Sequence, residues 1–406
     1  MRAIILTLSL SLFINLSSQV DDMVSLSAGY VNQSFYSLEN GEVANVINTD
    51  WDIAFMSDAF NSSIIINDNI GTQLYLYSNN SEDWDAVDTT GLDWAPLYNS
   101  EFRWEEGAFV QLASEVDPFD YGWGIYNFIT HVVTGNRIFI LELADGTFKK
   151  VIIESLDLGT YTFKYADLDG QNEVVESVSG ADYNTKNFWY YSLQNETVID
   201  REPASDSWDI TFTRYITEAL PGQNYLVTGV LQNIGITASE AREIEVDDAE
   251  WTDYSLFEDI NVVGSDWKYF NLDQFQYIVE DSLSFFVQDQ GGNVWKLIFT
   301  DFDGTSTGDI EFTKEMVSAT GLDEQGKVDF TVFPNPSLGQ MTVILPIEDE
   351  LVRWSVVDMK GAVVIQDSWN FGFQHEVNLG DLETGIYLLQ VEKEDGIGQE
   401  RIIIQR

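Results

Sequence analysis

Few side chains in this sequence are suited to catalysis or to binding a metal. The 406 residues include no cysteine and only two histidines, His131 and His375. The absence of cysteine excludes thiolate nucleophiles, thiolate metal sites and disulfide bonds. A serine–histidine–aspartate triad in the first 330 residues would have to use His131, and we expect no nucleophile elbow to accompany it. We therefore expect a protein that is not an enzyme.

Carboxylates are the reactive groups that the chain has in excess. Asp and Glu number 68, so a pair of acids of the kind that glycosidases use stays an alternative, although no one pair stands out. Two short stretches, Asp167-x-Asp169-Gly170 and Asp301-x-Asp303-Gly304, place two acids before a turn glycine. Neither supplies the six or more oxygen ligands of a calcium loop.

The charge of the chain limits its partners. Lys and Arg number only 19, and the formal net charge is −49. Such a protein repels nucleic acid and anionic lipid. The acids are interspersed with aromatic and β-branched residues, as in residues 82–94 and 247–260, which is typical of solvated strand faces and loops.

The first residues have the layout of a secretory signal peptide. Residues 1–18 contain one cation at Arg2, an apolar run and a small-residue end. The run is too short for a stable membrane span, and no later stretch predicts one. We expect the mature chain to begin near Gln19 or Val20.

The elements that would position any site are β-strands. Short alternating runs, such as residues 137–146 and 293–299, are separated by Gly, Asn and Asp turns, and helical periodicity is scarce. The sequence therefore predicts an all-β protein.

Several of these runs occur twice in the same order. The motif Ser-Leu-x-Asn followed by Trp-Asp-Ile occurs at residues 37–53 and again at 192–210, and three later stretches recur 144 to 149 residues apart. This predicts a duplicated domain of about 140 residues. In each Trp-Asp strand we expect the Trp and the Phe to share a face, and we expect Asp52 and Asp209 to fix a turn or a backbone amide.

The repeated motifs carry a resemblance to a known family. Ser-Leu-x-Asn, Trp-Asp-Ile-Ala-Phe, Trp-x-x-Tyr-Asn, a Thr-His step and an Asp-Gly hairpin resemble the HmuY-like family, secreted all-β proteins of Bacteroidetes whose founding members bind haem. The resemblance covers residues 30–165 and, in divergent form, 185–316. It implies axial His or Met ligands, for which His131 and Met56 are the candidates in the first repeat. The second repeat has no histidine at the matching place.

The last residues carry the most specific motifs. They resemble the type A C-terminal sorting domain of the type IX (Por) secretion system. The resemblance rests on an opening motif, a turn, a strand and a basic last strand, with the motif residues Phe333, Pro334, Asn335, Pro336, Gly339, Asp358, Gly361, Gly385 and Tyr387. It implies recognition by an outer-membrane translocon, and release of the cargo or its attachment to the cell surface.

These observations give one organisation and one function. The expected parts are a signal peptide (1–18), two HmuY-like β domains (20–170 and 180–318), a linker (319–328) and an immunoglobulin-like β-sandwich for sorting (329–406). The expected function is that of an exported, non-enzymatic binding protein, secreted or attached to the outer-membrane surface, with haem or another small apolar molecule as the ligand. A structural or adhesive surface protein without such a ligand, and a carboxylate-dependent hydrolase, are the alternatives.

Overall fold

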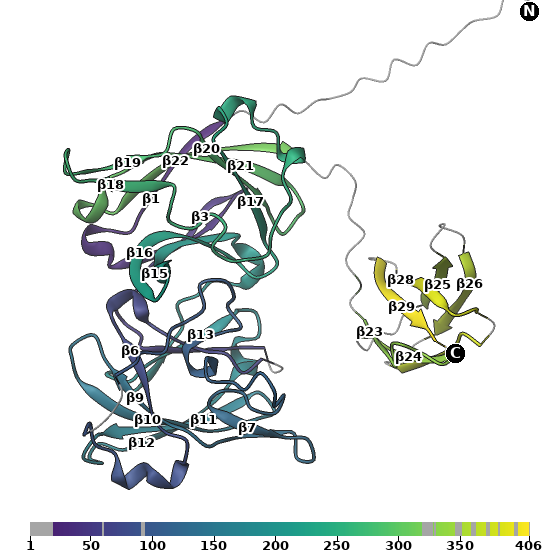
Figure 1. The fold of residues 1–406 in the computed structure, drawn as a ribbon, viewed down its shortest axis with the longest axis horizontal. Helices are drawn as coiled ribbons and strands as arrows, with labels where there is room; N and C mark the ends of the chain where they lie inside the picture. Colours follow the sequence, from purple (N-terminus) through teal and green to yellow (C-terminus); the bar gives the residue numbers. More distant parts are fainter. Residues whose placement is uncertain are drawn as a thin grey trace, which may run out of the picture. The chain divides into compact units, whose positions relative to one another are not determined.

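The computed structural model shows an all-β protein, as the sequence predicts (Figure 1). It describes residues 19–405 except 59–60, 91–93, 319–327, 329, 346–350, 359–362, 371–373, 381 and 394–396. The chain forms two compact units, which divide at residues 319 and 320. The expected signal peptide, nearly all of the expected linker and Gly361 of the sorting motif lie outside the described residues.

The first unit contains two lobes, each with its own hydrophobic core. Lobe 1 is continuous in sequence and spans residues 51–200. A four-stranded antiparallel sheet in the order β14-β13-β4-β5 faces a larger sheet in which β12-β11-β10-β8-β7 are neighbours and β9 joins β10 to β6. The strands are β4 (Ile53–Met56), β5 (Ile64–Ile66), β6 (Gln73–Ser78), β7 (Gly124–Asn127), β8 (Val132–Gly135), β9 (Ile138–Glu142), β10 (Phe148–Asp157), β11 (Thr160–Asp167), β12 (Val174–Ser179), β13 (Phe188–Ser192) and β14 (Thr197–Ile199). Short 3-10 turns lie between them: η2 (Asp68–Ile70), η3 (Ser81–Ala86), η4 (Ala108–Val110) and η5 (Gly180–Tyr183).

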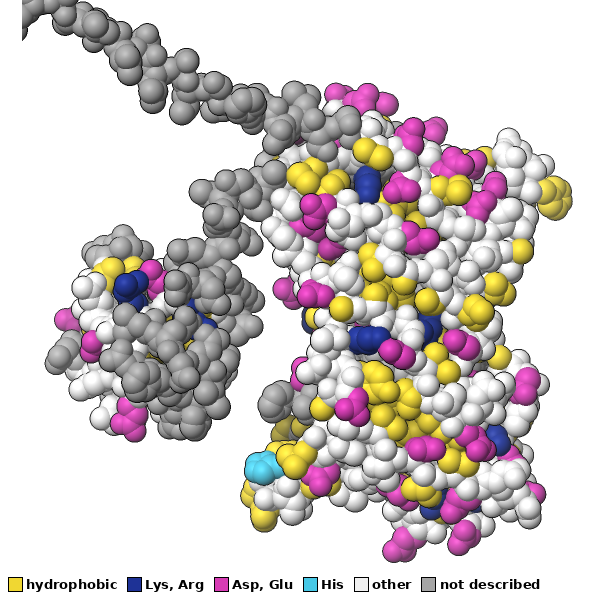
Figure 2. Space-filling view, turned by 180° about the vertical axis from the view of Figure 1, so that it is seen from behind, with side chains coloured by type: hydrophobic (Ala, Val, Ile, Leu, Met, Phe, Trp, Pro, Cys, Tyr) yellow, Lys and Arg dark blue, Asp and Glu magenta, His cyan; other side chains and the backbone are white. Residues whose placement is uncertain are grey.

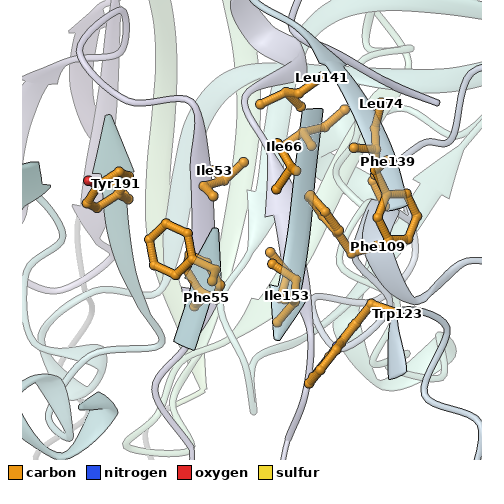
Figure 3. Packing of buried hydrophobic residues seen from close by; sticks show 14 of the residues in the cluster. Ile53, Phe55, Ile66, Leu74, Phe109, Trp123, Phe139, Leu141, Ile153 and Tyr191 are labelled. Carbon is orange, nitrogen blue, oxygen red and sulfur yellow. The ribbon is translucent and has the colours of Figure 1, made fainter. Parts of the chain in front are cut away.

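Aromatic and branched side chains from both sheets fill lobe 1 (Figure 3). Phe55 stacks on Trp189 with ring centroids 4.1 Å apart, and Trp123 is fully buried in the same core. Ile53 and Phe55 share this core, whereas Trp51 packs on the other side of the strand with Ala54 and Met56. The expected common face of Trp51 and Phe55 is therefore wrong, because the strand begins only at Ile53 and Trp51 lies in the irregular segment before it.

Lobe 2 is built from two separate stretches, residues 20–48 and 204–318. Its sheets have the orders β16-β15-β2-β3 and β1-β22-β21-β20-β17, and β18-β19 forms a separate hairpin. The elements are β1 (Val20–Ser25), η1 (Ala28–Tyr30), β2 (Asn32–Ser37), β3 (Gly41–Ile47), η6 (Ser205–Ser207), β15 (Ile210–Leu220), β16 (Gln223–Gln232), β17 (Thr237–Arg242), η7 (Val246–Asp248), η8 (Trp251–Asp253), β18 (Lys268–Asn271), β19 (Gln276–Val279), β20 (Leu283–Gln288), β21 (Val294–Phe302), η9 (Gly304–Ser306) and β22 (Asp309–Ser318).

The N-terminal strands complete lobe 2. Strand β1 pairs with the last strand, β22, in a register that joins Val20 to Lys314, and β2 pairs with β15. Val24, Leu26, Tyr36 and Leu38 lie in the core of lobe 2. Lobe 1 therefore begins and ends about 30 residues later than the expected first domain, 20–170, and lobe 2 combines residues 20–48 with most of the expected second domain, 180–318. The Ser-Leu-x-Asn hairpin of the first range belongs to lobe 2, and that of the second range belongs to lobe 1.

Equivalent aspartates anchor these hairpins. The backbone N–H of Leu193 donates to Asp52 Oδ2, and that of Leu38 donates to Asp209 Oδ2, both at 2.7 Å. Both carboxyls are buried, and burial raises the pKa of each. The prediction that these aspartates fix a backbone amide is confirmed.

Hydrogen bonds from the 99–106 loop and from β15 hold the two lobes together. Trp104 Nε1 of lobe 1 donates to the carbonyl of Gln232 (2.8 Å), and Arg214 of lobe 2 donates to the carbonyl of Asn69 (3.1 Å). Glu101 accepts from the hydroxyl of Thr217. These contacts make the lobes one unit.

The second unit is a small two-sheet β fold. Sheets in the orders β23-β24-β27 and β26-β25-β28-β29 share one core, which includes Val343, Trp354 and Leu389. The expected immunoglobulin-like arrangement of its strands stays a prediction. The strands are β23 (Thr331–Phe333), β24 (Gln340–Ile344), β25 (Leu351–Asp358), β26 (Val363–Asn370), β27 (Gln374–Asn378), β28 (Gly385–Glu392) and β29 (Ile397–Ile404).

Candidate ligand-binding surface

The hairpin formed by β7 and β8 ends in a turn that contains His131. Asn127 Oδ1 accepts hydrogen bonds from the backbone N–H groups of Ile129 (2.9 Å) and Thr130 (3.2 Å), which closes the turn. His131 follows in the left-handed region with φ 59°, a conformation that few residues other than glycine adopt. The Thr-His step of the sequence is thus the end of a hairpin.

Large apolar side chains surround this turn and face solvent. Phe128 is 66% exposed and Ile129 74% exposed. Phe119, from the neighbouring loop, stacks on Tyr126 with ring centroids 6.2 Å apart. We call Phe119, Tyr126, Phe128, Ile129 and His131 the aromatic patch. In Figure 2 the cyan histidine of this unit lies at the margin of lobe 1 beside hydrophobic side chains.

A hydrogen bond fixes the imidazole of His131. Tyr126 Oη lies 2.7 Å from His131 Nδ1. Within the described part of the chain this is the ring's polar partner, and when Nδ1–H donates to Tyr126 Oη the lone pair of Nε2 is open to a ligand. A histidine held at one nitrogen and open at the other is suited to bind a metal ion or an iron centre, since the hydrogen bond at the first nitrogen sets the orientation of the ring.

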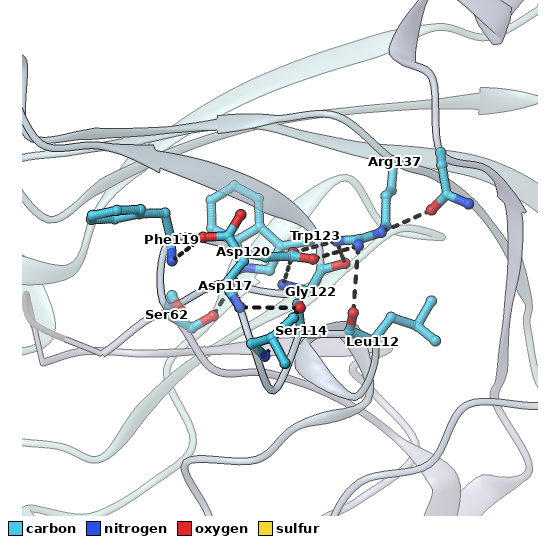
Figure 4. Close-up of polar contacts among 11 residues, drawn as sticks. Ser62, Leu112, Ser114, Asp117, Phe119, Asp120, Gly122, Trp123 and Arg137 are labelled. Carbon is cyan, nitrogen blue, oxygen red and sulfur yellow. Dashed lines mark hydrogen bonds and ion pairs between the residues drawn. The ribbon is translucent and has the colours of Figure 1, made fainter.

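A buried ion pair positions the loop that carries Phe119 (Figure 4). The guanidinium of Arg137 makes two parallel bonds to Asp120, at 2.7 and 2.8 Å, and Nε donates to Asn79 Oδ1 at 3.0 Å. The same guanidinium donates to the carbonyls of Gly122 and Leu112. These bonds hold the pKa of Asp120 below its usual range. They tie the loop from residue 112 to residue 122 to the start of β9.

Met56, the second predicted haem ligand, lies elsewhere. It is buried in β4, where it packs with Trp51, Ala54 and Phe188. Met56 lines a surface pocket with Asp58, Leu158 and Lys186, and His131 is not part of its walls. The structure does not bring the two predicted ligands together.

The acidic stretches singled out in the sequence lie at the ends of strands β11 and β21 and in the turns that follow. Asp167 pairs with Lys149 at 2.5 Å and accepts from Asn172, and Asp303 accepts from Thr307. Among the described residues no group of three or more His, Asp or Glu is arranged to hold a metal ion.

The Gly-x-Ser-x-Gly spacing of a nucleophile elbow does occur, against expectation, at Gly304-Thr-Ser306-Thr-Gly308. It forms the 3-10 turn η9 between two antiparallel strands, whereas an elbow joins a strand to a helix. Ser306 donates to the carbonyl of Asp303 at 2.9 Å, and lobe 2 has no histidine.

A cavity of about 60 Å³ lies at the junction of the lobes. Its walls include Trp51, Trp104 and Trp208, and the buried Glu202, whose pKa burial raises to about 7. Because this volume is the space open to the centres of water-sized molecules, the cavity admits only a few waters and not a porphyrin.

The described residues of the sorting motif lie at turns and strands of the second unit. Asn335 donates through Nδ2 to the carbonyl of Arg401 and accepts from the N–H of Ile403. Gly339 has φ 114°, a region that favours glycine. Tyr387 donates to the carbonyl of Glu383 (3.1 Å). The opening motif is thus held against the last strand, β29.

Comparison with known proteins identifies this second unit. A search of curated proteins found no match to the chain. The resemblance of the preceding residues to the HmuY-like family stays a prediction.

Within the described residues no helix is long and apolar enough to cross a membrane. Residues 331–405 match the model of the secretion system C-terminal sorting domain, so the chain carries the tail of a protein exported by the type IX system to the cell surface or beyond.

Proposed function

We propose that this exported protein is a non-enzymatic binding protein that takes a flat apolar ligand against the aromatic patch of lobe 1. Haem is the ligand of first choice. The observation that carries the proposal is the exposed His131, held at Nδ1 by Tyr126 among exposed aromatic side chains.

The chemistry of the patch fits a haem group in three ways. An imidazole nitrogen is a common axial ligand of haem iron, and a hydrogen bond from Nδ1–H to Tyr126 Oη orients the ring. Phe128 and Ile129 offer apolar surface beside His131. The ion pair of Arg137 and Asp120 keeps the loop that bears Phe119 in place before a ligand arrives, which lowers the entropic cost of binding.

A haemin titration tests the proposal. Residues 19–406 are titrated and the Soret band is followed, beside the variants His131→Ala and Tyr126→Phe. We expect a saturable shift with one haemin per protein in the wild type. The shift should be lost in His131→Ala, and the affinity should fall about tenfold in Tyr126→Phe, which is the lower end of the effect of losing such an orienting partner.

The chain offers a matched control in its other histidine. His375 lies in the sorting unit, where its ring stacks on Trp369 at 4.4 Å. His375→Ala should leave the titration unchanged. A response that survives in His131→Ala, or that is lost in His375→Ala, contradicts the proposal.

A further inference from the structure

Lobe 2 carries a hairpin end that is built like the one in lobe 1. Strands β18 and β19 are joined by a turn in which Asn271 Oδ1 accepts from the backbone N–H groups of Asp273 (2.9 Å) and Gln274 (3.0 Å). Phe275 has φ 54° and takes the place that His131 has in lobe 1. Residues 268–279 contain no histidine or methionine, so the haem binding proposed for lobe 1 does not extend to this hairpin.

The side chains of this hairpin end are apolar and face solvent. Leu272 is 75% exposed and Phe275 80% exposed, and Tyr269 and Phe270 are each nearly half exposed. We call these four residues the lobe 2 tip; the hairpin that bears it lies at the outer margin of lobe 2 (Figure 1). A bulky aromatic residue in the left-handed region is strained, and Phe275 gains little packing in return. Clusters of this kind mark contact surfaces in soluble proteins.

The charges around the tip indicate what it would contact. The exposed Asp273 lies in the turn, and the exposed Asp281 follows β19. Asp266, before β18, pairs with Arg242 at 2.6 Å. Lys268 is the one base between residues 266 and 281, and it is buried with its ammonium bonded to the carbonyl of Thr228. The apolar tip is therefore set in negative surroundings, on a chain whose net charge is −49.

We propose that the lobe 2 tip is a docking surface for a cationic, apolar segment of another protein. Burial of Leu272 and Phe275 against apolar side chains supplies the affinity. The acidic surroundings speed the encounter with a basic partner and disfavour anionic surfaces, including lipid headgroups. The proposal does not depend on what binds in lobe 1.

Fluorescence anisotropy with a defined peptide tests this docking. The probe is a labelled 18-residue amphipathic helix of Lys and Leu, titrated with residues 19–406. A second peptide, with Ser in place of Leu, has the same charge and no apolar face. We expect saturable binding of the first peptide, and affinity at least tenfold lower for the second.

Paired variants locate the contact. Leu272→Ser/Phe275→Ser should weaken binding of the Lys/Leu peptide at least tenfold, while Phe128→Ser/Ile129→Ser, the matched change in lobe 1, should have little effect. Because all four side chains are exposed, the melting temperature should not change, and the haemin response of the lobe 2 variant should stay intact.

Three results would overturn the proposal. Equal affinity for the two peptides would reduce the contact to general charge attraction. An unchanged affinity in Leu272→Ser/Phe275→Ser would place the contact elsewhere. In the third result, the peptide does not bind, but the protein self-associates or binds zwitterionic phosphatidylcholine vesicles, and this binding is lost in Leu272→Ser/Phe275→Ser. The tip would then contact a second copy of the protein or a lipid surface.

Discussion

Asp52 and Asp209 show how a buried carboxylate can serve structure alone. Each accepts a backbone N–H of the Ser-Leu-x-Asn turn that pairs with its strand. Leu193 and Leu38, the donors, are buried as well, so their amide groups have no access to water. The carboxylates substitute for that water, and the turns depend on them.

Removing either carboxylate should destabilise the first unit to a similar degree. Asp52→Ala and Asp209→Ala each leave a buried N–H without an acceptor, which costs about 1–3 kcal/mol. Asp52→Asn should recover most of the loss, because the amide oxygen can still accept. Urea denaturation measures the difference. The prediction of equal structural roles is contradicted if Asp52→Ala leaves the free energy of unfolding unchanged, or if only one of the two variants lowers it.

The role of these residues could be predicted from the sequence, and the site of His131 only in part. The recurrence of Trp-Asp next to strand residues indicated a structural carboxylate. The Thr-His step gave the residue but not its setting, because the exposure of Phe128 and the bond from Tyr126 depend on how the hairpin end is supported. Met56 follows the strand motif directly. Because side chains alternate along β4, its side chain points into a hydrophobic cluster that is separate from the aromatic patch.

At the scale of elements, the ion pair of Arg137 and Asp120 links a loop to a strand. Arg137 starts the stretch that leads into β9, and Asp120 lies in the loop that bears Phe119. Both side chains are about 10% exposed, so the pair is largely removed from water. Removal of one partner leaves the other charge buried and unpaired.

Arg137→Ala should cost about 3–5 kcal/mol of unfolding free energy, as for other broken buried pairs. It should also weaken haemin binding, since Phe119 loses its support. The double variant Arg137→Met/Asp120→Leu should be less destabilised than Arg137→Ala, because no charge is stranded. Chemical denaturation of the three proteins, with a haemin titration of each, tests this. Additive losses in the double variant would show that the two side chains act independently.

At the scale of the whole first unit, its first and last strands, β1 and β22, pair in lobe 2. The strands could be predicted from alternation and turn residues, but their assignment to lobes could not. Both repeats contain the same two motifs. A Ser-Leu-x-Asn hairpin can therefore pair with the Trp-Asp strand that follows it in its own repeat, or with the Trp-Asp strand of the other repeat. The structure uses the other repeat for Tyr36 and for Tyr191. Local propensity is the same for both choices.

This arrangement predicts which fragments fold. Residues 50–202 contain the complete core of lobe 1 and should fold alone. Residues 203–318 lack Val24, Leu26, Tyr36 and Leu38, so they should stay unfolded until a peptide of residues 19–48 is added. Circular dichroism and amide dispersion in NMR spectra report the outcome. Folding of residues 203–318 without the peptide contradicts the closure by the N-terminal strands.

The central claim is that the ligand of this exported protein lies against the aromatic patch. Hydrogen–deuterium exchange of residues 19–406, with and without haemin, tests the claim most directly. The account predicts that haemin slows exchange in residues 114–135, which contain the loop of Phe119 and the hairpin of His131, and leaves exchange in the lobe 2 tip unchanged. Slowed exchange around Trp51 and Glu202 at the lobe junction, or no change anywhere in lobe 1, would contradict it.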